Sequence, residues 1–139
     1  MSARRRRALA LMERLRGLDI DTVSREMADV RNKMEKLRRE RTELRERMET
    51  ESQVTSIEAQ IHVSSYVDAV TRQIRRLDAQ MAQLDPILTA HEDKLKELYR
   101  EQKVYESVRL RDAYREKVER EKREAAELEE ITVLRWNRG

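Results

Sequence analysis

Cysteine is absent from this 139-residue chain, which also contains only two glycines, one proline and no phenylalanine. The absence of cysteine excludes disulfide bonds and thiol chemistry, and it fits a reducing compartment. Two glycines cannot build a glycine-rich loop of the kind that holds a phosphate. Aromatic residues make up 4% of the chain. This profile is typical of long helices and not of an average globular domain, so we expect a narrow hydrophobic contact with most side chains in water.

Long hydrophobic runs are missing as well. No stretch of the sequence approaches the ~18 apolar residues that a membrane span requires, and no signal-type hydrophobic region follows the N-terminus. The run Arg4–Arg7 before a short apolar stretch has some likeness to an organelle transit peptide, but Glu13 and the helical pattern that follows argue against one. We therefore expect neither an integral membrane protein nor a protein secreted through a leader.

Charge is plentiful but balanced. Charged residues make up 42% of the chain, and the formal net charge is only +3. Because the signs alternate along the sequence, any preference for a partner must come from local patches. One such patch covers residues 4–16, with six arginines against one glutamate. It predicts either contact with an anionic surface, namely phosphate, a lipid headgroup or an acidic protein ring, or a solvated helix start.

The arginine-rich segment is also amphipathic. Its apolar residues are Leu9, Leu11, Met12, Leu15 and Leu18, which predict a basic amphipathic helix. Stacking aromatic residues and known nucleic-acid-binding motifs are both missing here, which argues against a nucleic acid partner. Gly17 and the following Asp19–Thr22 weaken helicity, and we expect a bend or a one-residue shift of the pattern there.

The strongest pattern is an alternation of three- and four-residue steps between apolar positions. It runs from Val67 to Tyr105, and a second series runs from Val23 to Thr55, with Arg41 as the one polar residue among its first eight positions. Such a repeat is the a/d seam of a coiled coil, which needs a partner helix. We predict an all-α protein, a long antiparallel two-helix coiled-coil hairpin. Its seam residues are Met27, Val30, Met34, Leu37, Leu44, Met48, Val70, Ile74, Leu77, Met81, Leu84, Leu88, Leu95 and Leu98.

The two series can be paired in more than one way. A first alignment places Leu37 opposite Leu88 and folds the chain back between His62 and Val63, just before a Ser65-x-x-Asp68 helix-start signature. A second alignment, shifted by one heptad, is equally allowed and moves the turn to about residue 59. The heptads alone do not choose between them.

We expect one coiled-coil domain over 1–139, with a first helix at about 4–60, a turn at about 59–65 and a second, longer helix at about 65–135. Pro86 removes a helical hydrogen bond. It is therefore either a kink in a continuing helix or the tip of the hairpin, and the unbroken seam around it favours the kink. Beyond Tyr105 the repeat drifts to Leu110, Tyr114 and Val118. The last turns then extend past the N-terminus without a partner helix.

No catalytic constellation stands out. The carboxylates lie among lysines and arginines on solvated helical faces, and the two histidines, His62 and His91, are not spaced as ligands on one helix. His91 is expected as a tolerated seam residue. We predict no catalytic residue, no metal site and no cofactor, and therefore a protein that is not an enzyme.

The C-terminal half resembles a known family. The residues that carry the likeness are the run Lys103–Arg111, the charged run Glu119–Glu124 and the closing Glu127–Ile131. This order of a Lys-x-x-Glu-apolar step, a charged run and an acidic pair before a short apolar end is similar to the end of the flagellar FliJ family and of its type III secretion stalk relatives. The arginine-rich start and the Tyr66-Val67-x-x-Val70 segment agree with it.

The resemblance implies a function. It implies a hairpin like the central stalk of rotary ATPases, whose termini enter the pore of a hexameric export ATPase. The hairpin approaches an export-gate membrane protein, and the protein escorts export chaperones. These partners hold it peripherally at the inner face of the bacterial cell membrane. The residues carried over as ring contacts are Lys103, Glu106, Arg109, Glu129 and Glu130. Trp136 is either a terminal packing residue or an anchor of the same contact.

The aromatic patch that family members can use toward the gate is poorly matched, because the corresponding segment here is Met34–Met48 without aromatic residues. Two other functions remain open at the level of sequence. One is a structural adaptor built from a continuous helix that dimerises in parallel, with residues 54–65 as a stutter. The other is a basic helical nucleic-acid binder.

Overall fold

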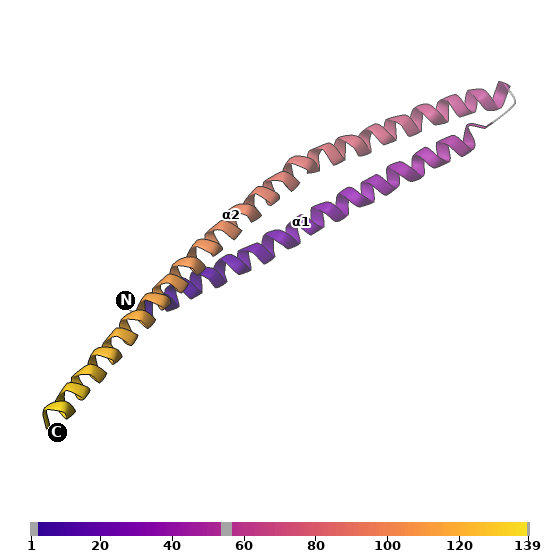
Figure 1. Cartoon of the computed structure of the whole chain (residues 1–139). Helices are drawn as coiled ribbons and strands as arrows, with labels where there is room; N and C mark the ends of the chain where they lie inside the picture. Colours follow the sequence, from indigo (N-terminus) through magenta and orange to yellow (C-terminus); the bar gives the residue numbers. More distant parts are fainter. Residues whose placement is uncertain (1–2, 54–56, 139) are drawn as a thin grey trace. The chain divides into compact units, whose positions relative to one another are not determined.

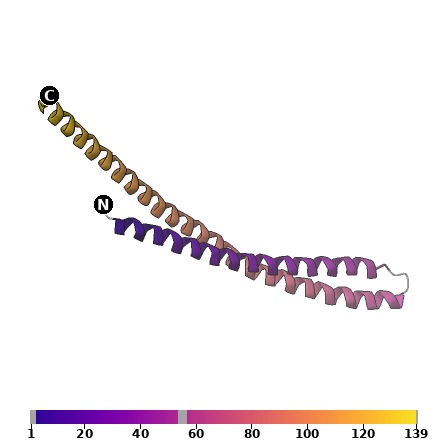
Figure 2. The same cartoon turned by 90° about the horizontal axis from the view of Figure 1, so that it is seen from below.

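Two α-helices account for the structure. The computed structural model describes residues 3–53 and 57–138, in which α1 spans Ala3–Glu51 and α2 spans Ile57–Arg138. The chain reverses between them, and the helices then lie antiparallel, as Figures 1 and 2 show for the segments on either side of the reversal. The predicted all-α, two-helix hairpin is thereby confirmed. It replaces the alternative of one continuous helix that dimerises in parallel.

The contacts of the chain fall into two compact units, which are described separately. The terminal unit consists of Met1–Ile20 and Glu97–Gly139, and the hairpin unit consists of Asp21–Lys96. Each unit therefore contains one segment of α1 and one of α2.

The hairpin unit is built around the apolar seam. Its most buried side chains are Val30, Val70, Ile74 and Leu77, all at most 9% exposed. The other seam residues of this unit are half-buried. A narrow seam of this kind leaves the flanking positions in water, which agrees with the high proportion of charged residues.

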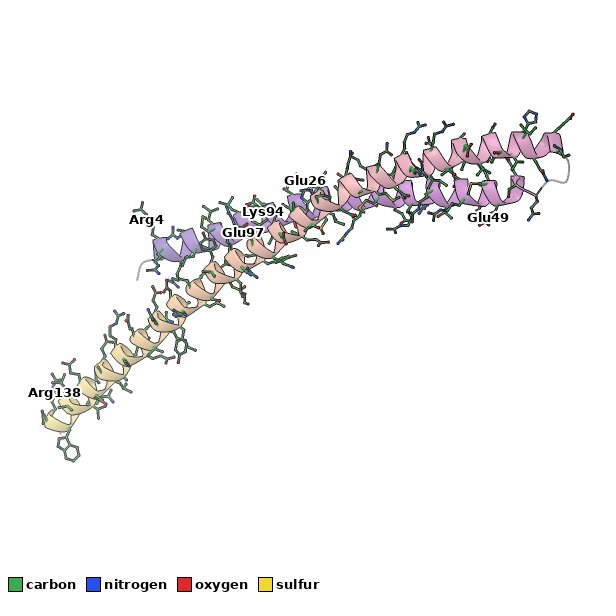
Figure 3. All side chains as sticks on the ribbon, turned by 90° about the horizontal axis from the view of Figure 1, so that it is seen from above. Arg4, Glu26, Glu49, Lys94, Glu97 and Arg138 are labelled. Carbon is green, nitrogen blue, oxygen red and sulfur yellow. The ribbon has the colours of Figure 1, made fainter. Side chains whose placement is uncertain are left out.

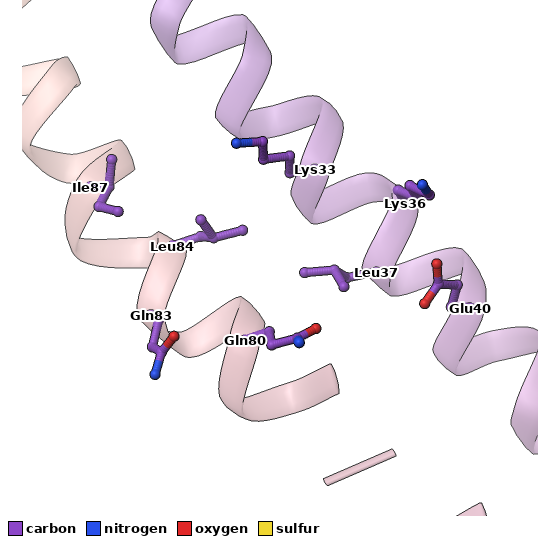
Figure 4. Close-up of a pocket in the computed structure, with 8 residues that line it drawn as sticks. All are labelled: Lys33, Lys36, Leu37, Glu40, Gln80, Gln83, Leu84 and Ile87. Carbon is purple, nitrogen blue, oxygen red and sulfur yellow. The ribbon is translucent and has the colours of Figure 1, made fainter. Parts of the chain in front are cut away.

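The register of the hairpin differs from the first alignment. That alignment placed Leu37 opposite Leu88, whereas Leu37 and Leu84 point toward each other across a groove between α1 and α2 (Figure 4). Arg41 Nη1 lies 2.8 Å from Asp78 Oδ1. The first alignment would have put Arg41 opposite Leu84. The contacts agree instead with the alignment shifted by one heptad, which puts Arg41 opposite Leu77 and next to Asp78.

Apolar contacts do not explain this choice. A shift of one heptad maps every apolar seam position onto another, so apolar contacts barely discriminate between the two alignments. Arg41 does not discriminate either, because the first alignment would place it next to Asp85 as the observed one places it next to Asp78. His91 Nδ1 lies 3.9 Å from Glu26 Oε2, and the position equivalent to Glu26 in the first alignment is Lys33. The observed register therefore gives His91 an acidic neighbour in place of a basic one.

The connection between the helices comes earlier than predicted. α1 ends at Glu51, where Ser52 N donates a hydrogen bond to the Met48 carbonyl oxygen at 3.0 Å. α2 already begins at Ile57, with Glu58 in its first turn, where a negative charge favours the helix N-terminus. Residues 59–65, predicted as the turn, are helical. The Ser65-x-x-Asp68 quartet thus lies inside α2, because such a quartet is also compatible with a helix interior.

Two predicted irregularities fall inside the helices. α1 is continuous through Gly17, and a Cβ added at Gly17 would lie 3.1 Å from Gln102 Nε2, so glycine leaves room for the end of the Gln102 side chain. The seam continues backward from Val23 to Ile20 and Arg16 without the predicted shift. α2 runs through Pro86, so Pro86 is not the tip of the hairpin. The kink predicted at Pro86 stays a prediction.

Candidate partner interface

The terminal unit continues the seam with charged residues in place of apolar ones. We call this the polar seam, and its members are Arg6, Glu13 and Arg16 on α1 and Gln102, Arg109, Asp112 and Glu116 on α2. Each of them is buried or half-buried. Apolar contributions to the core of this unit come mainly from Ile20 and Leu98, which are 7% and 2% exposed. The helices of the terminal unit are therefore paired through ionic contacts as well as through apolar ones such as Leu9 and Tyr105, which are half-buried.

The cross-helix contacts of the polar seam are short. Arg6 Nη2 lies 2.7 Å from Glu116 Oε2, and Arg109 Nε donates a 2.7 Å hydrogen bond to Glu13 Oε1. Arg16 Nη1 lies 3.2 Å from Glu101 Oε2. The Gln102 side-chain amide donates a further hydrogen bond to the Glu13 carbonyl oxygen at 3.2 Å. The pKa of Arg109 is raised above its ordinary value first by the hydrogen bond that Arg109 donates to Glu13 and then by the charge of Glu13.

Asp112 is the most buried charged residue of the chain's described part. Its side chain is 2% exposed, and its Oδ2 lies 3.2 Å from Arg5 Nε without an aligned hydrogen bond. The Nε atoms of Arg6 and Arg16 are likewise buried without a hydrogen-bond partner. Burying charges costs free energy that imperfect pairing does not fully offset. The pairing of α1 and α2 in the terminal unit consequently gives less stabilising free energy per paired residue than an apolar seam would.

The sequence reading missed the polar seam. It followed the apolar residues beyond Tyr105 to Leu110 and Tyr114, but these side chains are 51% and 67% exposed. The three- and four-residue steps in fact continue through Arg109, Asp112 and Glu116. The signal was present in the spacing, and it was overlooked because the residues at those positions are charged.

The C-terminal part of α2 is bare. Every residue from 119 to 138 is exposed, and Figures 1 and 2 show α2 continuing past the N-terminus of α1. We call this segment the overhang. Its large apolar side chains are Leu128, Ile131, Val133, Leu134 and Trp136. Trp136 is 84% exposed, so it does not pack against the rest of the described chain.

The residues expected at a partner contact fall into two groups. Lys103, Glu106 and Arg109 lie where α2 is paired with α1, and Glu129, Glu130 and Trp136 lie on the overhang. The groups are about 30 Å apart along the helix, at 1.5 Å per residue. Lys103 Nζ lies 3.5 Å from Glu106 Oε1 on the surface, whereas Arg109 is turned inward to Glu13. Glu129 and Glu130 line a shallow surface hollow together with Arg123 and Val133.

Neither a metal centre nor a membrane span emerges from residues 3–53 and 57–138. Nowhere in these ranges do three or more histidine, aspartate or glutamate side chains gather as metal ligands would. Neither helix has, in the same ranges, an apolar stretch long enough to cross a membrane.

Comparison with known proteins agrees with the helical pattern. The family model described as "Flagellar FliJ protein" matches residues 11–139, which covers α2 completely and most of α1. No curated protein and no solved structure matches the chain.

Proposed function

We propose, since this chain belongs to the FliJ family of flagellar proteins and is therefore a component of the flagellar protein export apparatus, that it is a non-enzymatic stalk coupling an export ATPase to the export gate. The observation that supports this role most strongly is the overhang. It offers charged and apolar side chains that the chain itself does not cover. The overhang and the adjoining surface of the terminal unit then enter the pore of the hexameric ATPase.

The contact residues of this proposal differ in how they act. Glu129, Glu130 and Trp136 are exposed and meet the ATPase subunits directly. Lys103 and Glu106 present a surface ion pair to the same ring. Arg109 contributes at the edge of the pair of helices, where its guanidinium also holds Glu13. Tryptophan and arginine, represented here by Trp136 and Arg109, are common among the residues that dominate binding energy.

The proposed contact with the export-gate membrane protein belongs to the hairpin unit. Met34, Leu37 and Met48 are half-buried in the seam, so the contact uses outward-facing side chains of that unit. The proposal also includes escort of export chaperones. Through these partners the protein is held peripherally at the inner face of the bacterial cell membrane.

We expect the triple variant E129K/E130K/W136A to bind the cognate export ATPase about thirtyfold more weakly than the unaltered chain, because it removes an exposed aromatic anchor and reverses two charges. Its stimulation of ATP turnover should be lost in parallel. Titration calorimetry with the hexameric ATPase, together with steady-state ATP hydrolysis, measures both effects.

The matched control is E43K/E46K, which reverses two exposed glutamates of the hairpin unit. Its affinity for the ATPase should stay within about twofold of the unaltered chain. A swap variant, K103E/E106K, keeps the surface ion pair but exchanges the positions of its charges. If the ATPase ring contacts Lys103 and Glu106, this variant should bind the ATPase more weakly than the unaltered chain. Equal affinity of the triple variant and the control would refute the assignment of the overhang to the ATPase.

A further inference from the structure

The outer side of the first five turns of α1 carries exposed leucines and arginines. Leu11, Leu15 and Leu18 are 56%, 40% and 55% exposed. Leu9 and Met12, by contrast, are half-buried. The apolar residues of the basic amphipathic helix are thus divided between two sides, and only one side is covered.

The arginines of the same segment are divided in the same way. Arg5, Arg6 and Arg16 form ion pairs with carboxylates of α2. Arg4, Arg7 and Arg14 are exposed, and no ion pair joins them to any residue of 3–53 or 57–138. Figure 3 shows Arg4 extending away from the ribbon into solvent.

The uncovered leucines and arginines lie together. At about 100° per residue, Leu11, Leu15, Leu18, Arg4, Arg7 and Arg14 all project within an arc of about 100°. We call these six residues the basic leucine face. Glu13, the only acidic residue between positions 3 and 18, is on the opposite side and bonded to Arg109. The face therefore combines positive charge with exposed apolar area and contains no carboxylate.

A hollow lies next to this face, and of its three arginines Arg6 and Arg109 already pair with Glu116 and Glu13. It measures about 360 Å³ and is lined by Arg6, Arg7 and Arg109 with three alanines. The Nε of Arg6 is buried there without a hydrogen-bond partner. Guanidinium groups bind phosphate oxygens well because their planar donors match the geometry of the anion.

We infer that the basic leucine face binds an anionic lipid bilayer directly, with the leucines at the boundary of the acyl chains and the arginines among the headgroup phosphates. A helix that lies in the membrane interface combines these two features, a strip of apolar side chains and flanking basic residues. An acidic protein surface would complement the charges but would not require the exposed leucines to be aligned with them. The inference goes beyond the proposed stalk function, in which membrane association comes through partners. It concerns the chain before its terminal unit enters the ATPase ring, and it is tested without any other protein.

The first experiment measures sedimentation of the full chain with vesicles of phosphatidylglycerol and phosphatidylcholine, and with vesicles of phosphatidylcholine alone, at low salt. We expect binding to the anionic vesicles only, falling as salt is raised. Each arginine near an anionic surface contributes a factor of about five, so R4Q/R7Q/R14Q should lower partitioning about a hundredfold. L11A/L15A/L18A should lower it about tenfold, through lost apolar burial.

The matched control is R72Q/R75Q/R76Q, which removes three exposed arginines from the hairpin unit. It should stay within about twofold of the unaltered chain. All nine substituted side chains are exposed, and circular dichroism verifies that each variant remains helical. Equal losses in the control and in the arginine variant would overturn the inference, as would an unchanged affinity of the leucine variant or equal binding to neutral vesicles.

A second experiment locates the contact. Because the chain has no cysteine, L15C carries a single environment-sensitive fluorophore, and A79C carries it on an exposed position of the hairpin unit. A blue shift on anionic vesicles is expected for the label at position 15 and not for that at position 79. Tight binding of the isolated chain to polyglutamate or duplex DNA, with no shift on vesicles, would replace the lipid by another polyanion and overturn the inference.

Discussion

The pKa of Tyr66 depends on residues at the end of α1. It lies opposite the end of α1, where desolvation raises the pKa of its hydroxyl above the ordinary value, with further upward contributions from the charge of Glu51 and a hydrogen bond to Glu51, while Arg47 acts in the opposite direction. The neutral form of Tyr66 is therefore favoured in the folded chain relative to the unfolded chain. A group with a raised pKa in the folded state stabilises the fold below its unfolded pKa, and this stabilisation is lost as the pH rises through the folded value.

We therefore expect the free energy of unfolding to decrease as the pH rises above about 10, the ordinary pKa of tyrosine. Y66F removes the titrating hydroxyl, so it should flatten the part of this decrease that belongs to Tyr66. Urea titrations of both proteins at several pH values between 8 and 11 measure the difference. Y114F alters an exposed tyrosine of α2 and serves as the control. Identical pH profiles for Y66F and Y114F would contradict the assignment.

At the scale of the element, the seam of α2 carries the stability of the hairpin unit. Leu77 is 3% exposed and stands at the centre of this seam. L77A leaves a cavity that two helices cannot easily close, and it should lower the free energy of unfolding by about 3 kcal/mol. L134A makes the same change on the overhang, where the side chain is 56% exposed, and should change stability by less than about 0.5 kcal/mol. Chemical denaturation measures both, and similar losses for the two variants would be inconsistent with the described seam.

The number and direction of the helices could be predicted from the sequence, whereas their register could not. The steps of three and four residues predicted two helices and their antiparallel pairing, because a long apolar strip must be covered. They did not predict the register, since a slide of one heptad exchanges equivalent apolar positions. Arg41 does not select one alignment, because it has an aspartate beside it in both, Asp78 or Asp85. A neighbour of His91 does differ, since it is Glu26 in the observed register and Lys33 in the first alignment.

The helix ends and the candidate interface were harder to predict. The connection between α1 and α2 has no proline or glycine to mark it. A moderate start signature at Ser65 outweighed the true start at Ile57, since serine and aspartate also occur inside helices. The exposure of Trp136 followed from the unequal lengths of the helices. The inward turn of Arg109 did not, because it depends on Glu13 from the far end of the sequence.

At the scale of the whole molecule, the two units are stabilised by different forces. The hairpin unit is held by apolar burial, and the terminal unit by partly exposed ion pairs around Asp112. Salt screens partly exposed ion pairs, while it leaves apolar burial intact. The chain therefore contains a segment of pairing whose strength depends on the ionic environment.

We expect amide hydrogen exchange of residues 3–16 to accelerate about tenfold when sodium chloride is raised from about 0.05 M to about 0.5 M, because several ion pairs of about 0.5 kcal/mol each are weakened together. Residues 23–48 of the same helix should change by less than about threefold and provide the internal control. Exchange followed by mass spectrometry resolves the two segments. Equal acceleration in both would mean that the polar seam does not govern the pairing of the terminal unit.

The bare stretch at residues 119–138 has one more consequence. Most helices in proteins pack one side against other residues, so a ligand can reach only the opposite side. No side of this stretch is covered, so its whole circumference is available over a length of about 30 Å. A partner that encloses this stretch can contact it from every direction at once. If the helix turns about its own axis, its side chains then exchange one set of contacts for another while the helix and the partner stay bound.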